Sequence, residues 1–267
     1  MAERMTCGAL QRELSADKDY NTGKGNAVVT GSSRGIGAAI ALALGKAGYN
    51  VLVHYHEQKE KAEGIADQIR SMGVRAEVCQ ADLSRREECG KLFQYAAEKF
   101  GTIDVWVNNA GMKGRMPFLE AEIDFVEELY ATNLMSVVYC DWHVVRHMVG
   151  NGHGHVITVS SIGGQMGFPG NAEYSGGKAA LIGRAKAIAK EVGPNGVRYN
   201  VVCPGQTQTD MLARSKPEDV EATRLATPLR RLVQPYEIAD AVMYLLDAPS
   251  MTGQVISVNG GLLMTAW

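Results

Sequence analysis

Short apolar, β-branched runs alternate along the chain with longer segments in which apolar residues recur at helical spacing. The short runs predict seven strands, at 27–30, 51–55, 74–78, 103–108, 155–160, 197–202 and 254–258. The first intervening segments, at 35–48, 59–73 and 85–101, each end at a glycine, a common helix terminator. This alternation predicts strands that are joined by helical crossovers.

Helical crossovers join parallel strands, so the pattern predicts an α/β fold. The expected architecture is a doubly wound, parallel, seven-stranded sheet with helices on both faces. Because no internal repeat or linker divides the chain, residues 25–267 are predicted to form one domain, preceded by an N-terminal extension at 1–24. The irregular, charged stretch at 206–234 is expected to be a lid or binding loop.

The first predicted strand runs into the turn TGSSRGIG at 30–37, and a helix follows it. Gly31, Gly35 and Gly37 suit a tight turn before a helix N-terminus whose free amides can face a pyrophosphate. A glycine pattern alone is a weak indication of binding. Its place between the first strand and the first helix favours dinucleotide binding over a purely structural turn.

This turn and the motifs that follow it resemble the short-chain dehydrogenase/reductase family over about residues 25–265. The motifs are GxxxGxG at 31–37, NNAG at 108–111, ATNL around Asn133, a serine at 161, YxxxK at 174–178 and proline-glycine at 204–205. In motif the chain is most similar to the family's 3-oxoacyl-acyl-carrier-protein reductases. The resemblance implies a Rossmann-like fold and four catalytic residues, Asn133, Ser161, Tyr174 and Lys178.

Tyr174 and Lys178 are four residues apart, so a helix presents them on one face. A phenol ordinarily has a pKa of about 10, and a nearby ammonium group lowers it. Tyr174 is therefore predicted to exchange a proton with a substrate oxygen that Ser161 also hydrogen-bonds. The resemblance implies that Asn133 holds a water linking Lys178 to solvent. An exposed Tyr–Lys contact on a surface helix is the alternative, which Ser161 and the glycine turn disfavour.

Gly176 and Gly177 depart from the family's pattern, which usually has alanine and serine there. Each glycine costs about 1 kcal/mol relative to alanine in a helix interior. The sequence therefore predicts a catalytic helix with reduced rigidity and one polar contact fewer near the cofactor.

The resemblance implies a nicotinamide dinucleotide cofactor. The residues expected to bind it are Gly31, Ser33, Arg34, Gly35, Ile36, Gly37, Tyr55, Asp82, Leu83, Asn109, Ala110, Gly111, Tyr174, Lys178, Pro204, Gly205, Thr207 and Thr209. Among them, Asp82 is expected at the adenine amino group, and Thr207 and Thr209 at the nicotinamide carboxamide.

Two residues favour NADP over NAD. Tyr55 stands at the end of the second strand, where an acidic residue would accept the 2′-hydroxyl of NAD. The guanidinium group of Arg34 can pair with a 2′-phosphate. His54 and His56 are also near enough in sequence to touch that phosphate, although ordinary surface positions are expected for them.

The net charge and the cysteines limit the classes of partner and the cellular compartment that are expected. A net charge of −2 gives no field for nucleic acid or an anionic membrane, and no apolar run has the length of a bilayer span or signal peptide. The five cysteines are scattered, which indicates free thiols and a cytoplasmic protein. Histidines occur in pairs two or four residues apart, but no carboxylate or cysteine stands at ligand spacing beside them, so no metal is expected. The resemblance implies a homotetramer or homodimer.

The sequence thus predicts an NADP(H)-dependent oxidoreductase that interconverts a carbonyl and a secondary alcohol on a small molecule, with Tyr174 as general acid and base. A 3-oxoacyl-acyl-carrier-protein reductase of fatty acid or polyketide synthesis is one alternative. Such enzymes commonly present basic residues near the site mouth where this chain has Gly152 and Asn195, which disfavours it. A catalytically silent NADP-binding regulatory protein is the other alternative, disfavoured because all four catalytic residues are present.

Overall fold

A seven-stranded sheet forms the centre of the computed structural model, which describes residues 23–210, 212 and 216–264. Every pair of neighbouring strands is parallel, in the order β3-β2-β1-β4-β5-β6-β7. The strands are β1 (Gly25–Val29), β2 (Tyr49–Tyr55), β3 (Ala76–Gln80), β4 (Val105–Asn108), β5 (Gly154–Val159), β6 (Val197–Pro204) and β7 (Val255–Val258). The predicted doubly wound parallel sheet is confirmed.

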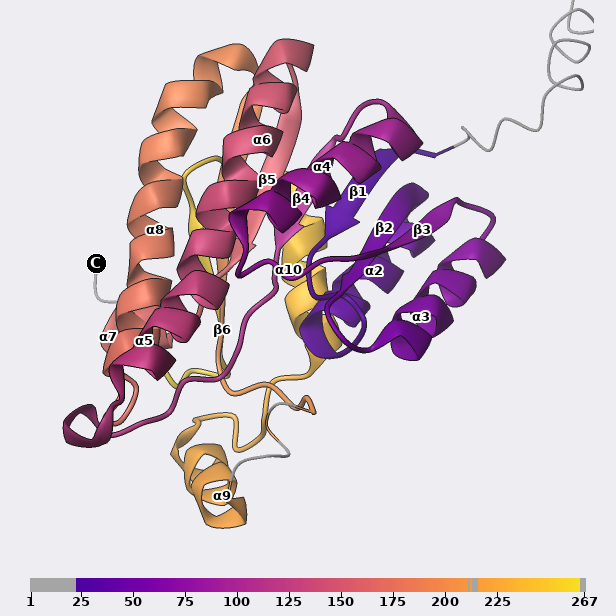
Figure 1. Cartoon of the computed structure of the whole chain (residues 1–267). Helices are drawn as coiled ribbons and strands as arrows, with labels where there is room; N and C mark the ends of the chain where they lie inside the picture. The colour runs from indigo at the N-terminus through magenta and orange to yellow at the C-terminus, as the bar shows by residue number, and fades with distance from the viewer. Residues whose placement is uncertain (1–22, 211, 213–215, 265–267) are drawn as a thin grey trace, which may run out of the picture.

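Helices cover both faces of this sheet (Figure 1). One face packs against α2 (Gly35–Lys46), α3 (Lys59–Ser71) and α10 (Pro235–Asp247). The other face packs against α4 (Arg86–Phe100), α6 (Ser136–Asn151) and α8 (Ala172–Val192). Because both faces are buried, the central strands are continuous apolar runs without polar alternation: Val28 and Leu52 face one layer while Val29 and Val53 face the other.

The remaining elements lie in the connections between the strands and the long helices. Before α6 come η1 (Phe118–Glu120), α5 (Ile123–Tyr130) and one π-helical turn, η2 (Ala131–Met135). After β5 come α7 (Gly163–Met166), η3 (Gly193–Asn195) and α9 (Pro217–Ala226). Figure 1 shows α9, in orange, set apart from the sheet, and none of its residues is buried. The stretch expected to form a lid thus contains a helix that covers no core.

The strand order reverses between β1 and β4, so the loops that follow these two strands diverge there. Open parallel sheets bind their ligands at such a point. Most of the N-terminal extension predicted at 1–24, with Cys7, lies outside the described residues, and the single domain at 25–267 stays a prediction. In the described part of the chain, no helix combines the length and apolarity that a membrane crossing needs.

Candidate active site

The glycine turn after β1 has a backbone that side chains would not permit. Gly31 and Gly35 have φ angles of +62° and +59°, in the left-handed region. A Cβ atom on Gly37 would lie 2.3 Å from the carbonyl oxygen of Gly31. The turn is therefore compact, and the first amides of α2, which lack intrahelical acceptors, are free to face a ligand.

The loop after β4 is fastened to this turn. The hydroxyl oxygen of Thr30 accepts hydrogen bonds from the backbone amides of Asn109 at 2.9 Å and Ala110 at 3.0 Å. In return, Nδ2 of Asn109 donates to the carbonyl oxygens of Thr30 at 2.9 Å and Gly31 at 3.0 Å. The first asparagine of NNAG, Asn108, lies within β4, and the second, Asn109, bonds the glycine turn from the other side of the switch point.

His54 is a residue that the sequence interpretation missed. The expectation of an ordinary surface position is wrong, because His54 is 2 % exposed. Its Nδ1 accepts a hydrogen bond of 2.8 Å from the amide of Gly31, and its Nε2 donates to the carbonyl oxygen of Ala81 at 3.0 Å. Burial lowers its pKa to about 4, which keeps the ring neutral. The only signal in the sequence was its place within a buried strand, two residues after Leu52.

A cavity of about 810 Å³ lies over the turn and along the ends of the central strands. Most of the predicted residues line it: Gly31, Ser33, Arg34, Gly35, Ile36, Gly37, Tyr55, Asn109, Ala110, Gly111, Ser161, Tyr174, Lys178, Pro204, Gly205, Thr207 and Thr209. The fold thus brings together residues that are more than 170 positions apart in the chain.

Asp82 and Leu83 are predicted residues that do not line this cavity. The carboxylate of Asp82 accepts hydrogen bonds from the amide of Ser84 at 3.1 Å and from its hydroxyl group at 2.7 Å. These bonds lower the pKa of Asp82. Leu83 is buried in the core below α4. Neither side chain is brought to the cleft.

Tyr174, Lys178 and Ser161 meet where β5 ends. Ser161 follows that strand and lies beside Tyr174, since a Cβ atom on Gly163 would lie 3.3 Å from Oγ of Ser161 and 3.5 Å from Cε1 of Tyr174. The ammonium group of Lys178 lies 5.9 Å from the centroid of the Tyr174 ring and donates a 3.0 Å hydrogen bond to the carbonyl oxygen of Val159. Lys178 is only 5 % exposed, and burial lowers its pKa to about 8. The predicted trio is therefore assembled at the cleft.

The predicted direction of the Tyr174 pKa is wrong. Burial raises the pKa of Tyr174, and the neighbouring hydroxyl group of Ser161 lowers it by less. The physical reason is that the amine of Lys178 bonds the main chain of β5 and makes no direct bond to the phenol. In this structure the phenol is a protonated group near neutrality.

Asn133 acts on the backbone of the neighbouring loop. Its Oδ1 accepts from the amide of Met112 at 2.7 Å, and its Nδ2 donates to the carbonyl oxygen of Met112 at 3.0 Å. The π-helical turn η2 carries Asn133, and such turns are frequent at functional sites. A Cβ atom on Gly111 would lie 2.8 Å from Oδ1 of Asn133 and 3.8 Å from Nζ of Lys178, so these side chains converge at Gly111.

A buried carboxylate fastens the catalytic helix to the sheet. Asp141 of α6 accepts hydrogen bonds from Nδ2 of Asn108 at 2.9 Å and from the hydroxyl group of Tyr199 at 2.8 Å. Arg184 of α8 donates to the same carboxylate at 3.1 Å. Burial raises the pKa of Asp141 to about 6, although these donors oppose the shift. The network joins β4 and β6 to both helices beneath the site.

At the end of β2 the cleft is lined by Tyr55, where no acidic residue stands. Tyr55 is 7 % exposed and packs in the core while it still lines the cleft. Arg34 is half-exposed there, with Nη1 3.9 Å from Oδ2 of Asp210. The same carboxylate oxygen accepts a 3.0 Å hydrogen bond from Lys61. Arg34 is thus a cation at the cleft, loosely paired with a shared carboxylate.

Three segments, at 112–119, 163–172 and 216–234, are linked to one another. The amide of Met116 donates to the carbonyl oxygen of Gly170 at 2.7 Å, and Arg115 pairs with Asp219 of α9 at 2.5 Å. Residues of all three segments line the cavity.

The expectation that Gly152 and Asn195 mark the site mouth is wrong within a single chain. They precede β5 and β6, and a Cβ atom on the adjacent Gly196 would lie 2.3 Å from the carbonyl oxygen of Gly152. Both residues therefore lie at the amino-terminal edge of the sheet, opposite the cleft. The lack of basic side chains at these two positions is therefore no argument against a carrier protein at the cleft of the same chain.

The cleft fits a dinucleotide. The glycine turn forms a cradle that side chains would fill, and the first turn of α2 offers unpaired amides beside it. In the described part of the structure, Oε1 of Gln206 is buried in the cleft lining and has no hydrogen-bond partner, so it can accept from an amide donor of a bound ligand. Among the described residues no group of three metal-ligating side chains occurs.

A parallel sheet with a glycine turn at its switch point and a Ser–Tyr–Lys set at the end of β5 defines a dinucleotide-binding oxidoreductase of the Rossmann type. The family model for short chain dehydrogenase matches residues 25–220. The chain belongs to the short-chain dehydrogenase family. It is accordingly an NAD(P)-dependent oxidoreductase of the class that interconverts carbonyls and alcohols.

Individual relatives agree with this assignment. The chain is 37 % identical to the 3-oxoacyl-[acyl-carrier-protein] reductase FabG of Staphylococcus epidermidis, over 90 % of this chain and 99 % of that protein. It superposes with a TM-score of 0.85, at 30 % identity, on a short chain dehydrogenase from Burkholderia cenocepacia in complex with NADP, covering 90 % of this chain and 98 % of the other. A 7α-hydroxysteroid dehydrogenase complexed with NADH and 7-oxoglycochenodeoxycholic acid matches equally well, with a TM-score of 0.85 at 30 % identity, covering 91 % and 95 % of the two chains.

Proposed function

We propose that the protein reduces a ketone on a small molecule with NADPH, and that Tyr174 donates the proton. The observation that carries this proposal is the juxtaposition of Tyr174 and Ser161 at the cleft, where burial keeps the phenol protonated. A protonated phenol is the form that carbonyl reduction requires. The bound dinucleotide supplies the hydride.

Two residues of the chain contact the substrate oxygen, and two others support them. Ser161 and Tyr174 both offer hydroxyl donors, which hold the carbonyl oxygen and stabilise the negative charge that develops on it. Lys178, with a pKa of about 8, carries a positive charge for most of the time at pH 7 and is held beside the Tyr174 ring by its bond to the main chain of β5. Asn133 keeps the loop at Met112 in place.

We propose that the cofactor is bound by the cleft residues that the family resemblance identifies. The glycine turn with Arg34 holds the phosphates, Asn109 to Gly111 and Lys178 hold the ribose side, and Thr207 and Thr209 hold the carboxamide. Asp82 remains the proposed contact of the adenine amino group. For this contact, its carboxylate would have to give up part of its hydrogen bonding to Ser84.

NADP is the proposed cofactor because of Arg34 and Tyr55. Arg34 offers a guanidinium group at the cleft, and the buried Tyr55 leaves no carboxylate that would repel a 2′-phosphate. The solved relatives include both an NADP and an NADH complex, so structural similarity alone does not decide between the two cofactors.

The decisive experiment follows the absorbance of NADPH and NADH over a panel of ketones with the full chain. We expect kcat/KM to be at least tenfold higher with NADPH than with NADH, because one charge-assisted contact with the 2′-phosphate contributes about that factor in affinity. An equal or higher kcat/KM with NADH would contradict the cofactor proposal. Tight NADPH binding without turnover on any ketone would contradict the reductase and favour the silent regulatory protein.

A 3-oxoacyl-acyl-carrier-protein reductase is the second candidate, favoured by the 37 % identity to FabG over nearly the whole of that protein. Comparing kcat/KM for a 3-oxoacyl carrier protein with that for the matching small thioester separates the two candidates. A much higher value with the carrier protein would establish the second.

We also propose a homotetramer or homodimer, testable by light scattering; the cytoplasmic location stays a prediction.

A further inference from the structure

The bare face of the catalytic helix is covered by an aromatic ring from another helix. Gly176 and Gly177 of α8 face Tyr130, the last residue of α5. A Cβ atom on Gly177 would lie 3.6 Å from Cε1 of Tyr130, an ordinary contact, whereas one on Gly176 would lie 3.0 Å from its hydroxyl oxygen. The hydroxyl group of Tyr130 therefore leaves little room for a side chain at position 176, whereas a methyl group at position 177 would contact the ring without displacing it.

The hydroxyl group of Tyr130 is anchored on the same helix. It donates a 2.9 Å hydrogen bond to Oε2 of Glu173, the residue immediately before Tyr174. Residues 173, 176 and 177 share one helix face, at spacings of three and four. Tyr130 thus spans the helical turn that carries Tyr174, with a polar contact at one end and ring contacts at the other.

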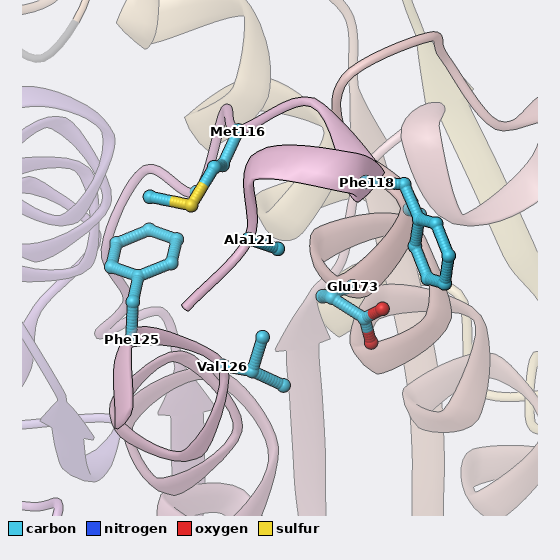
Figure 2. A pocket seen from close by; sticks show the side chains of 8 residues that line it. Met116, Phe118, Ala121, Phe125, Val126 and Glu173 are labelled. Atoms are coloured by element: carbon cyan, nitrogen blue, oxygen red, sulfur yellow. The ribbon is translucent and has the colours of Figure 1, made fainter. Parts of the chain in front are cut away.

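The residue that receives this hydrogen bond, Glu173, is half-buried. Figure 2 shows Glu173 beside Phe118 and Val126, at the edge of a small pocket lined mainly by apolar side chains of α5 and of the loop before it. Its volume is about 10 Å³, which leaves room for no more than a water molecule. The apolar walls favour the hydrogen bond with Tyr130 over a solvent-exposed position of the carboxylate.

Tyr130 also precedes the second catalytic element. It is the residue before the π-helical turn η2, and three residues later Asn133 holds the backbone of Met112. A displacement of Tyr130 would therefore move the turn of α8 that carries Tyr174 and the turn that carries Asn133 together.

We propose that Tyr130 is a positioning residue, which fixes the Tyr174 turn of α8 against α5 and compensates for Gly176 and Gly177. It acts through the orientation of Tyr174 and does not touch the reacting atoms. The inference rests on the proposed reductase function of Tyr174.

The first test compares Tyr130→Phe with Tyr244→Phe, a matched control on an exposed tyrosine of α10. Because small misplacements of a catalytic group cost one to two orders of magnitude, we expect Tyr130→Phe to lower kcat about tenfold with KM nearly unchanged. Tyr244→Phe is expected to retain the wild-type kcat. Glu173→Gln keeps an acceptor oxygen and is expected to lose less activity than Glu173→Ala.

The second test uses the close approach at Gly176. Gly176→Ala is expected to lower kcat in the wild-type background, because its Cβ would press on the Tyr130 hydroxyl group. In the Tyr130→Phe background the same change is expected to raise kcat, since the methyl group then has room and alanine stiffens the helix. The sign of the Gly176→Ala effect therefore reverses between the two backgrounds.

Amide hydrogen exchange supplies a readout that needs no turnover. Tyr130→Phe is expected to accelerate exchange in residues 131–135 and 172–178, with NADPH affinity and melting temperature close to wild type. A kcat within twofold of wild type, unchanged exchange in these segments, or an equal effect of Gly176→Ala in both backgrounds would each overturn the proposal. If the wild type reduces no ketone, the proposed function fails, and exchange alone still decides the role of Tyr130.

Discussion

The imidazole of His54 accepts a hydrogen bond of 2.8 Å from the amide of Gly31, while its other nitrogen donates to the carbonyl oxygen of Ala81. One buried, neutral ring therefore connects the glycine turn to the loop after β3. Protonation of His54 would place a donor against the Gly31 amide and break that tie.

We expect this tie to make stability depend on pH. Burial lowers the pKa of His54 from 6.5 to about 4, so the unfolded chain binds the proton more readily. The stabilisation is complete above pH 6.5 and is lost as the pH falls toward 4, with an upper magnitude of about 3 kcal/mol. His54→Gln is expected to flatten this dependence in urea unfolding, compared with His56→Gln at the exposed neighbour. Equal slopes for both variants and the wild type would contradict the prediction.

Tyr174→Phe separates proton transfer from cofactor binding. Removing the hydroxyl group takes away the proposed acid, and we expect kcat to fall by about 10²–10⁴-fold. NADPH affinity, measured by fluorescence titration, is expected to stay within about threefold, because the ring that lines the cleft is retained. A variant that binds NADPH normally and keeps more than half of the wild-type kcat would rule Tyr174 out as the proton donor.

The strands, the crossover helices and the glycine turn could be predicted because their signals are local. The buried strand from Val51 to Val53 is a continuous apolar run, and Gly31, Gly35 and Gly37 follow β1 at once. These patterns depend on backbone periodicity and turn sterics, which a single sequence carries. The structure accordingly gathers nearly all predicted cofactor residues around one cleft.

The features that could not be predicted depend on tertiary burial. The direction of the Tyr174 pKa follows from desolvation and from the bond of Lys178 to Val159, and neither appears in the YxxxK spacing. The role of His54 required the loop at Ala81 to fold against β2. Tyr130 opposite Gly176 joins positions 46 residues apart (176 − 130), which no local pattern connects.

Gly37→Ala tests whether the turn needs a bare Cα atom. The added methyl group would lie 2.3 Å from the carbonyl oxygen of Gly31, so the turn must open. We expect a lower melting temperature and at least a tenfold loss of NADPH affinity, as for a displaced anion cradle. Gly64→Ala in α3 is the matched control, because its methyl group would meet nothing within 4 Å and should stabilise the helix by up to about 1 kcal/mol. Equal NADPH affinities in the two variants would contradict a pyrophosphate site at the turn.

Arg34 and Lys61 share Asp210 as a partner, but only Arg34 lines the cleft. The two residues therefore allow the charge of the region to be separated from direct recognition of a 2′-phosphate. Arg34→Ala removes the guanidinium group at the cleft, and we expect kcat/KM with NADPH to fall about tenfold or more while that with NADH changes less than threefold. Lys61→Ala removes the same formal charge nearby and is expected to leave the ratio of NADPH to NADH nearly as it is.

Ionic strength distinguishes this contact from long-range attraction. Screening shortens the reach of exposed charges to about 8 Å at physiological salt and to about 3 Å at 1 M. If Arg34 binds the phosphate directly, its substitution should still reduce the NADPH preference at 0.5 M salt, although by a smaller factor. If both variants lower kcat/KM with NADPH equally, and salt abolishes both effects, the preference arises from the summed charge around Asp210 and Arg34 holds no phosphate.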